Sequence, residues 1–508
     1  MLWVKNIEGV LKGKIFMTKE EYLREIDRIN SVGKFKADWE SLAEHETPKW
    51  FMKGKFGIFI HYGIYSVPGF GNEWYSRNMY NKNSREYQHH IETYGKQKDF
   101  GYKDFIPMFK AENFDAKRWI EIFRKAGAKY VVPVMEHHDG FAMYDTAFNK
   151  WNAVNMGPGR DICGELKNEC EKQGLTFCGS SHRAEHYFFM NLGREIESDV
   201  SDDRYRDFYG PAVLCPEWDD SDLAAGTEDV YKKGASCEWL EDWLVRTAEL
   251  IDKYQPAMLY FDWWIQNHSF KPYLQKIAAY YYNRAIEWGK EVTICYKHQA
   301  FAPKTATFDV ERGALNEISP DYWQTDTAMG NNSWGYVKDN TFKSAYKLIC
   351  DMIDTVSKNG NFLLNIGPKP DGTFTEEEEK DLLAIGEWLA KNGEGIYGST
   401  YWSQYKEGET VAASGSFSDS KELEYTSEDF RFTYKGGSIY AFWMKPAEHD
   451  AVIKCFKKKN ERDFLVDKVT LLSTGEELKF ERNDDAMVIG AVNGFKSDMP
   501  VCFKIKLK

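Results

Sequence analysis

The stretch "KYVVPVMEHHDG" (129–140) is a short apolar run that ends in four consecutive polar residues. Its first half has the length and the β-branched residues of a buried strand. Glu136, His137, His138 and Asp139 then arrive together. A buried strand alone does not need four polar, mostly ionisable groups at its end, so the stretch predicts a strand and a functional site beside it.

Seven more apolar runs flank this one, and most are separated by helical patterns such as 115–127, 160–174 and 237–254. In chain order, the eight runs are 55–63, 129–140, 175–182, 257–264, 291–297, 305–311, 322–327 and 361–368. Alternation of strands and helices over this length predicts an α/β fold, a (β/α)₈ barrel. The gap between the fifth and sixth runs is too short for a regular helix.

The pattern changes after a predicted helix at 376–399. From about Thr400, short alternating segments at 431–444, 468–474, 486–492 and 501–507 are separated by turn residues, which predicts an antiparallel β-sandwich. We therefore expect an N-terminal helical arm (1–40), a catalytic barrel (41–398) and a C-terminal β-sandwich (399–508).

Composition narrows the class of protein. The 508 residues carry a net charge of −13, which argues against nucleic acid or an anionic membrane as the main partner. Aromatic residues make up 16% of the chain, which fits either ring stacking on carbohydrate or a large aromatic core. The nine cysteines include no C-x-x-C pair, and no apolar stretch of signal-peptide length is present, so we expect a cytoplasmic protein. No cofactor is expected.

Catalytic groups of such barrels lie at the carboxyl ends of the strands. Asp262 and Glu311 follow two strongly apolar runs, and histidines follow others. Two carboxylates among histidines are what retaining glycoside hydrolysis needs, one ionised as the nucleophile and one protonated as the general acid. Polar residues at the ends of the runs are His61, Glu136, His137, His138, Asp139, Ser180, Ser181, His182, Asp262, Lys297, Glu311, Asp326 and Asn365.

Alternatives remain open at this point. Histidines and carboxylates could also hold a divalent ion in a metal-dependent hydrolase, although no His-x-His follows the first strand. A non-catalytic carbohydrate-binding protein on the same fold is a further alternative. Taken singly, Asp262 fits a helix N-cap and His61 fits a core histidine, so only their joint placement supports catalysis.

Four long segments resemble family 29 glycoside hydrolases, the retaining exo-α-L-fucosidases. They are "WFMKGKFGIFIHYGIYSVPGFGNEWY" (50–75), "HHDGFAMYDTAFNKWNAVNMGPGRDICGEL" (137–166), "SWGYVKDN" (333–340) and "NGNFLLNIGPKPDGTF" (359–374). The resemblance implies a (β/α)₈ barrel with a C-terminal β-sandwich. It also implies hydrolysis of terminal α-L-fucose from fucosylated oligosaccharides or glycoconjugates, with no metal.

The resemblance also implies roles for particular residues. Asp262, in "LYFDWW", matches the nucleophile, and Glu311, in "TFDVERG", is the counterpart chosen for the acid/base, with Glu317 in reserve. Residues implied to bind the sugar are His61, Glu73, Trp74, His137, His138, His182, Tyr260 and Trp334.

Two departures from the family pattern stand out. Where the family often has Tyr-Tyr-Ser after the third strand, this chain has Ser180, Ser181 and His182, so His182 is expected to replace a tyrosine contact. An arginine expected between the two carboxylates is not evident, and Lys297 or Arg312 could take its place.

The sequence does not choose among α-1,2, 1,3, 1,4 and 1,6 linkages, because the leaving-group side is built from loops such as 70–104 and 183–235. It leaves the oligomeric state open, a homo-oligomer included.

The two adjacent histidines set a geometric requirement. Successive residues of a regular strand point to opposite faces, so His137 and His138 cannot both face the barrel mouth from a regular strand. We therefore expect the strand to become irregular at Glu136, through a bulge or a strained peptide. Both imidazoles are then expected to be neutral and to hydrogen-bond one sugar.

Overall fold

The computed structural model describes residues 17–213, 234–419, 423–458, 465–490 and 497–508. Parts of three expectations lie outside the described residues: 1–16 of the N-terminal arm, 214–233 of one leaving-group loop with Cys215, and 491–492 of one expected strand.

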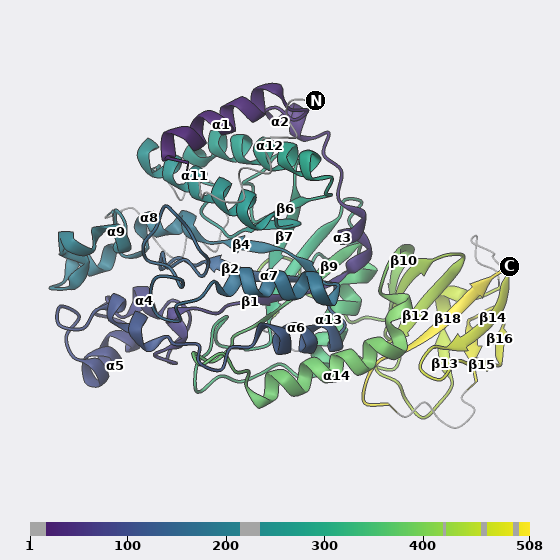
Figure 1. The fold of residues 1–508 in the computed structure, drawn as a ribbon. Helices are drawn as coiled ribbons and strands as arrows, with labels where there is room; N and C mark the ends of the chain where they lie inside the picture. The colour runs from purple at the N-terminus through teal and green to yellow at the C-terminus, as the bar shows by residue number, and fades with distance from the viewer. Residues whose placement is uncertain (1–16, 214–233, 420–422, 459–464, 491–496) are drawn as a thin grey trace.

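Eight parallel strands close into a barrel (Figure 1), and all eight predicted runs supply one. Short β3 (Thr176–Phe177) leads into β4, and both pair with β2. Strand β1 pairs with β2 and with β9, which closes the ring. The predicted (β/α)₈ barrel is confirmed. Its strands are β1 (Phe56–Ile60), β2 (Tyr130–Glu136), β4 (Gly179–Ser181), β5 (Met258–Phe261), β6 (Thr293–Tyr296), β7 (Thr307–Glu311), β8 (Trp323–Ala328) and β9 (Gly360–Ile366).

Long helices surround the barrel, and each begins at a side chain that accepts a backbone N–H, except α12, which has a proline in its first turn. They are α6 (Ala116–Lys125), α7 (Ile162–Gln173), α11 (Cys237–Tyr254), α12 (Lys271–Trp288), α13 (Ala345–Ser357) and α14 (Glu376–Asn392). No helix joins β6 to β7, as the short gap predicted, and none joins β7 to β8, where every connecting residue is described.

The N-terminal helix α1 (Lys19–Val32) packs on α11 and α12. Thr18 and Glu21 form a capping box at its start, and the Asn30 side chain donates to the Lys276 carbonyl oxygen at 2.9 Å. The limits of the N-terminal helical segment, 1–40, stay a prediction. Shorter helices are α2 (Trp39–Leu42), α3 (Lys49–Gly54), α4 (Tyr75–Asn78), α5 (Arg85–Tyr94), α8 (His186–Phe189) and α9 (Arg206–Tyr209).

The C-terminal part contains two antiparallel sheets that share one apolar core, so the predicted sandwich is confirmed. In Figure 1 it lies beside α13 and α14. One sheet contains β10 (Thr400–Glu407), β11 (Phe430–Lys435), β12 (Ser438–Trp443), β18 (Val501–Leu507), β14 (Val466–Leu471) and β15 (Glu476–Leu478), and the other β13 (Ala451–Ile453), β17 (Met487–Ile489) and β16 (Phe480–Arg482).

Polar contacts join the sandwich to the barrel. Buried Arg431 of β11 donates to Asp354 of α13 at 2.6 Å, and the Trp388 indole of α14 donates to the Pro500 carbonyl oxygen at 2.7 Å. The exact limit between the two units stays a prediction. Among the described residues, no helix combines the length and the apolar character that a membrane crossing requires.

Candidate active site

A cavity of about 450 Å³ opens at the carboxyl ends of the barrel strands. Nine of the eleven candidate residues line it, brought together from seven strand ends and loops: His61, Glu73, Trp74, His137, His138, His182, Asp262, Glu311 and Trp334. Tyr260 and Glu317 do not line it. The strand ends therefore converge as the barrel prediction required.

Strand β2 loses its regular pairing just before the two histidines. Its register to β4 shifts between Val134 and Glu136, which is a β-bulge. Both His137 and His138 then line the cavity, and their ring centroids are 4.3 Å apart. The predicted irregularity is confirmed.

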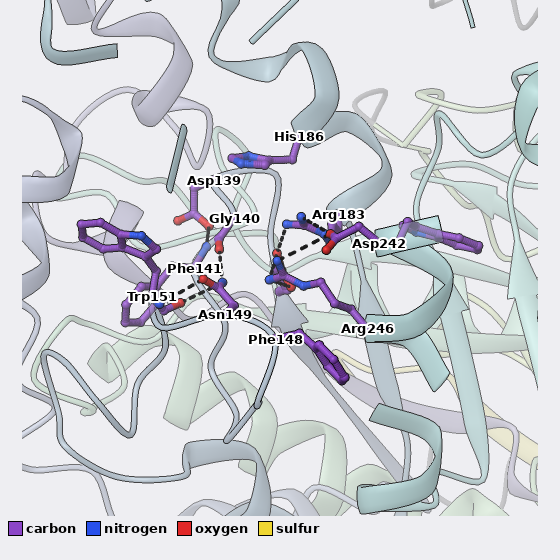
Figure 2. Close-up of polar contacts among 12 residues, drawn as sticks. Asp139, Gly140, Phe141, Phe148, Asn149, Trp151, Arg183, His186, Asp242 and Arg246 are labelled. Carbon is purple, nitrogen blue, oxygen red and sulfur yellow. Dashed lines mark hydrogen bonds and ion pairs between the residues drawn. The ribbon is translucent and has the colours of Figure 1, made fainter. Parts of the chain in front are cut away.

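The turn after the histidines is held by hydrogen bonds to neighbouring chain (Figure 2). The Asn149 side chain donates to the carbonyl oxygens of Gly140 at 3.0 Å and Trp151 at 3.1 Å. The Asp139 carboxylate accepts from Phe141 N at 3.0 Å. These bonds fix the backbone that presents the imidazoles.

Glu136 faces away from the cavity. Its carboxylate accepts from Arg183 Nη1 at 2.7 Å and from Arg246 Nη2 at 2.9 Å. Arg183 also donates to Asp242 at 2.7 Å (Figure 2). A buried charge needs such partners. Of the four polar residues that end the quoted stretch, Glu136 therefore anchors the strand while the two histidines line the cavity.

Asp262, the predicted nucleophile, is held by three basic side chains. Lys297 Nζ donates to Oδ1 at 2.9 Å, while His138 Nε2 and His182 Nδ1 lie 3.2 and 3.1 Å from Oδ2. Burial alone would raise the pKa of Asp262, but Lys297 and the two histidines hold that pKa well below its usual range. The carboxylate is therefore ionised, as a nucleophile must be.

Glu311, the predicted acid/base, shares Lys297 with Asp262. Burial raises the pKa of Glu311 to about 7; Lys297 opposes the rise and Asp262 adds to it. Because Lys297 Nζ lies 2.9 Å from Asp262 Oδ1 and 2.8 Å from Glu311 Oε2, these oxygens are at most about 5.7 Å apart. At this separation, ionised Asp262 can act as the nucleophile and protonated Glu311 as the acid on the same glycosidic bond.

Lys297 lies between the carboxylates of Asp262 and Glu311, the position for which both Lys297 and Arg312 were candidates. It lies 3.5 Å from Asp326 Oδ2 in addition to its other two carboxylates. Arg312 instead pairs with Asp419 at 3.2 Å and lies 5.6 Å from the Trp334 ring centroid. The choice between the two cations thus falls on Lys297.

His138 differs from its neighbours in charge. Its Nδ1 lies 2.9 Å from Glu185 Oε2, on the far side from Asp262. Burial disfavours the charged ring, but Glu185 and Asp262 together raise the pKa of His138 to about 10. The expectation of a neutral imidazole is therefore wrong at His138, because only the folded chain brings the Glu185 carboxylate beside its Nδ1.

Three other histidines of the cavity, His61, His137 and His182, are neutral. Burial lowers the pKa of His61 and His137 well below the usual range and lowers that of His182. His61 Nδ1 lies 2.6 Å from Asn365 Oδ1, and His182 Nε2 lies 2.6 Å from Ser180 Oγ. Each neutral ring can donate at one nitrogen and accept at the other, which suits hydroxyl groups.

These rings could also hold a metal ion. Nitrogen atoms of His61, His137 and His182 lie within 4.8 Å of one another, as do ligand atoms of His138, His182 and Asp262. His182 would then lose its contact with Asp262 or with Ser180, and His138 would have to lose a proton. The donor set therefore fits its present hydrogen bonds better than it fits a metal.

Aromatic rings form the walls. Trp74 and Trp263 stack with centroids 6.1 Å apart and planes 11° apart. Glu73 Oε2 accepts from Ser333 Oγ and from Trp334 N, each at 2.9 Å, and so holds the Trp334 loop over the cavity. Glu73 therefore fixes the backbone at Trp334, and both residues line the cavity.

Two candidates lie elsewhere. Tyr260 is fully buried beneath the cavity, where its hydroxyl donates to Asp326 at 2.8 Å and lies 3.3 Å from an Asp309 oxygen. Strand alternation places it in the barrel interior, two residues before Asp262 on the same face but one layer lower. Glu317 is exposed and outside the cavity.

Sequence reasoning missed several residues of the site. Glu185 lies in a short 3₁₀ helix (Arg183–Glu185) without a strand signal, and Phe417 comes from the C-terminal part. His298 and Asn72 also line the cavity. Trp263 was detectable as the neighbour of Asp262 at a strand end.

Comparison with known proteins gives a consistent result. The family model described as alpha-L-fucosidase matches residues 23–394. Tissue alpha-L-fucosidase of Mus musculus is 29% identical over 456 residues, covering 89% of this chain and 88% of the relative. That of Homo sapiens is 28% identical over 476 residues, covering 93% and 90%. The crystal structure of Thermotoga maritima alpha-fucosidase has a TM-score of 0.71 at 29% identity, covering 93% of this chain and 100% of that one.

Proposed function

Because the chain belongs to the alpha-L-fucosidase family, we propose that it hydrolyses terminal α-L-fucose from fucosylated oligosaccharides or glycoconjugates with retention of configuration. The observation that carries this proposal is the pair Asp262 and Glu311, joined through Lys297 and shifted in opposite directions in pKa. A separation of roughly 5–5.5 Å between the two carboxyl groups is typical of retaining enzymes.

The reaction has two displacements. In the first, an Asp262 carboxylate oxygen attacks the anomeric carbon while Glu311 donates its proton to the departing glycosidic oxygen, so the C–O bond to the leaving group breaks. In the second, Glu311 takes a proton from water, the water oxygen attacks the anomeric carbon, and the bond to Asp262 breaks. Two inversions give retention.

The surrounding residues have supporting roles in this proposal. Lys297 keeps Asp262 ionised and lies close enough to Glu311 to stabilise it after its proton has left. His138, charged because of Glu185, and neutral His182 orient Asp262. Neutral His61 and His137 line the cavity and can hydrogen-bond sugar hydroxyls, and Trp74 offers its ring face to the sugar.

The stereochemical course tests this proposal. Hydrolysis of an aryl α-L-fucoside followed by proton NMR should show the α-anomer of fucose first, with the β-anomer appearing only by mutarotation. Initial release of the β-anomer would exclude the double displacement. A panel of α-1,2, 1,3, 1,4 and 1,6 fucosides would then give the linkage preference. The cytoplasmic location and any homo-oligomer stay predictions.

A further inference from the structure

Residues 408–419, here called the arm, connect β10 to the rest of the sandwich by way of the barrel mouth. The arm runs antiparallel to the chain that leaves β7. Gly415 N donates to the Ala314 carbonyl oxygen at 2.9 Å, Phe417 N to that of Glu311 at 2.8 Å, and Asp419 N to that of Arg312 at 3.0 Å. The C-terminal part therefore bonds directly to the backbone of the proposed acid/base.

The close approach depends on a small residue. A Cβ atom on Gly313 would lie 1.9 Å from the Gly415 carbonyl oxygen, so only glycine fits where the arm crosses the end of β7. The turn at the tip is closed internally by the Ser418 hydroxyl, whose oxygen lies 2.9 Å from each of the carbonyl oxygens of Ala413 and Gly415 and can donate to either. The tip thus has a defined shape.

Charged contacts fasten the arm at its barrel end. The Asp419 carboxylate accepts from Lys343 Nζ at 2.6 Å, from Thr327 Oγ1 at 2.6 Å and from Arg312 Nε at 3.2 Å. Lys343 is 4% exposed, so this is a largely desolvated cluster in which each ion needs its partner.

The sandwich fastens the other end. Thr410 N and Oγ1 donate to Asp429, at 3.1 and 2.9 Å, and Arg431 Nη2 donates to the Thr410 carbonyl oxygen at 2.8 Å. The arm is therefore held at both ends, and its tip lies at the mouth.

Phe417 is the arm residue that lines the catalytic cavity. The residue is 56% exposed, and its φ of 57° lies in the left-handed region that phenylalanine rarely adopts. A strained, exposed aromatic residue at a cavity mouth does not contribute a packed core contact. Strain of this kind persists where the surrounding bonds enforce it, and it is typical of functional sites.

The position of Phe417 relative to Glu311 defines which part of a substrate it would meet. A general acid must lie beside the glycosidic oxygen, so the leaving group extends from the sugar on the Glu311 side. Asp262 and the four histidines beside it (His61, His137, His138 and His182) are buried, whereas Phe417 is exposed and its backbone N–H is bonded to the Glu311 carbonyl oxygen.

We propose that Phe417, presented by the arm, forms the platform on which the leaving-group sugar stacks, and that the C-terminal part thereby selects substrates whose leaving group is a ring. This inference rests on the proposed function and adds a specificity-determining residue to it. The ligand chemistry is a pyranose with an apolar C–H face, or an aryl group, lying against the phenylalanine ring.

The test compares a leaving group that has a ring with one that has none. α-L-Fucosyl fluoride releases fluoride, while a fucosylated lactose releases a disaccharide, and kcat/KM is measured for both with the full chain. Covering the exposed part of one aromatic ring is worth about a tenfold change. For Phe417→Ala, the ratio of kcat/KM for the fucosylated lactose to that for the fluoride should fall about tenfold, mainly through KM.

Matched variants isolate the ring. Phe417→Tyr should restore the ratio to within about twofold of the natural chain. Val411→Ala removes another exposed apolar side chain of the arm, 41% exposed and outside the cavity, and should leave the ratio unchanged. Unfolding temperatures of all three variants show whether each one is folded.

The outcomes are distinct. An unchanged ratio in Phe417→Ala, or an equal loss on both substrates, overturns the platform. If the natural chain hydrolyses neither fucosyl substrate, the proposed function is refuted instead.

Discussion

The mouth of the barrel and the core of the sandwich bury different kinds of side chain. At the mouth, Asp262, Lys297 and Asp326 are 5%, 3% and 0% exposed, and each depends on the charge of the others. In the sandwich, Phe432 and Phe503 are fully buried among apolar neighbours. Buried ions are stabilised only as a set, whereas buried apolar groups contribute through their own contacts. Removing one ion at the mouth should therefore change the ionisation of the ions that remain, and with it the chemistry, whereas removing an apolar side chain of the sandwich should lower stability.

Backbone conformation differs in the same way. Trp264, His298 and Arg312 follow β5, β6 and β7 with φ values of 80°, 56° and 45°, all in the left-handed region although none is glycine. The turn of the β11–β12 hairpin also needs positive φ values, and there they are adopted by Gly436 and Gly437. Left-handed conformations are thus occupied at a cost at the mouth and without cost in the hairpin.

The largest expected effect is at Asp262. Asp262→Ala should reduce kcat/KM for aryl α-L-fucosides on the order of 10⁴-fold or more, because no other group can form the covalent intermediate. Its unfolding temperature should change little, since Lys297 keeps Glu311 and Asp326 as partners. Glu317→Ala removes an exposed carboxylate outside the cavity and should retain full activity. Substantial activity in folded Asp262→Ala would contradict the division between mouth and sandwich.

Glu311 should show a large effect that depends on the substrate. Glu311→Gln should lower kcat/KM by about 10²- to 10⁴-fold for oligosaccharides, and far less for dinitrophenyl fucoside, whose leaving group needs no proton. Because the pKa of Glu311 is about 7 and its protonated form is the acid, kcat/KM of the natural chain for oligosaccharides should fall as pH rises through about 7. In Glu311→Gln, kcat/KM should no longer fall as pH rises through about 7. Equal losses on both substrates would assign Glu311 a different role.

Phe503 tests the opposite side of the comparison. Phe503→Ala should lower the free energy of unfolding by about 3–5 kcal/mol, because it leaves a cavity in an apolar core. Phe503→Leu should cost less. At a temperature where both variants are folded, kcat/KM should equal that of the natural chain. A loss of activity that parallels the loss of stability would mean that the sandwich core and the mouth are not independent.

The smallest expected effect is at Glu185. Glu185→Gln removes a charge that keeps the pKa of His138 at about 10, so that pKa should fall and His138 should lose its proton as pH rises within the assay range. We expect kcat/KM to fall about tenfold at pH 8 and less at pH 5, because Asp262 then loses one cation. Glu185→Asp, which keeps the charge, should behave like the natural chain. If the pH profile of Glu185→Gln is not shifted, the charge of His138 does not help to keep Asp262 ionised.

Much of this molecule could be predicted from its sequence, for identifiable reasons. Apolar runs with turn residues between them report strands directly, so all eight barrel strands and the sandwich were predictable. Strand ends of a barrel converge, so Asp262, Glu311 and the histidines were predictable as a group.

What could not be predicted depends on contacts distant in sequence. Glu185, in the 3₁₀ helix after β4, raises the pKa of His138 and keeps it protonated. Phe417 reaches the cavity from the C-terminal sandwich. The sequence motif indicates only that Tyr260 lies near Asp262, and the packed barrel is needed to show that its ring lies beneath the cavity.

The most direct test of the central claim, that Asp262 is the nucleophile of a retaining fucosidase, is covalent trapping. The full chain is inactivated with 2-deoxy-2-fluoro-α-L-fucosyl fluoride, digested and sequenced by mass spectrometry. We predict one 2-fluorofucosyl group per chain, attached to Asp262. A label on Glu311 or another residue, or inactivation without any label, would contradict the account.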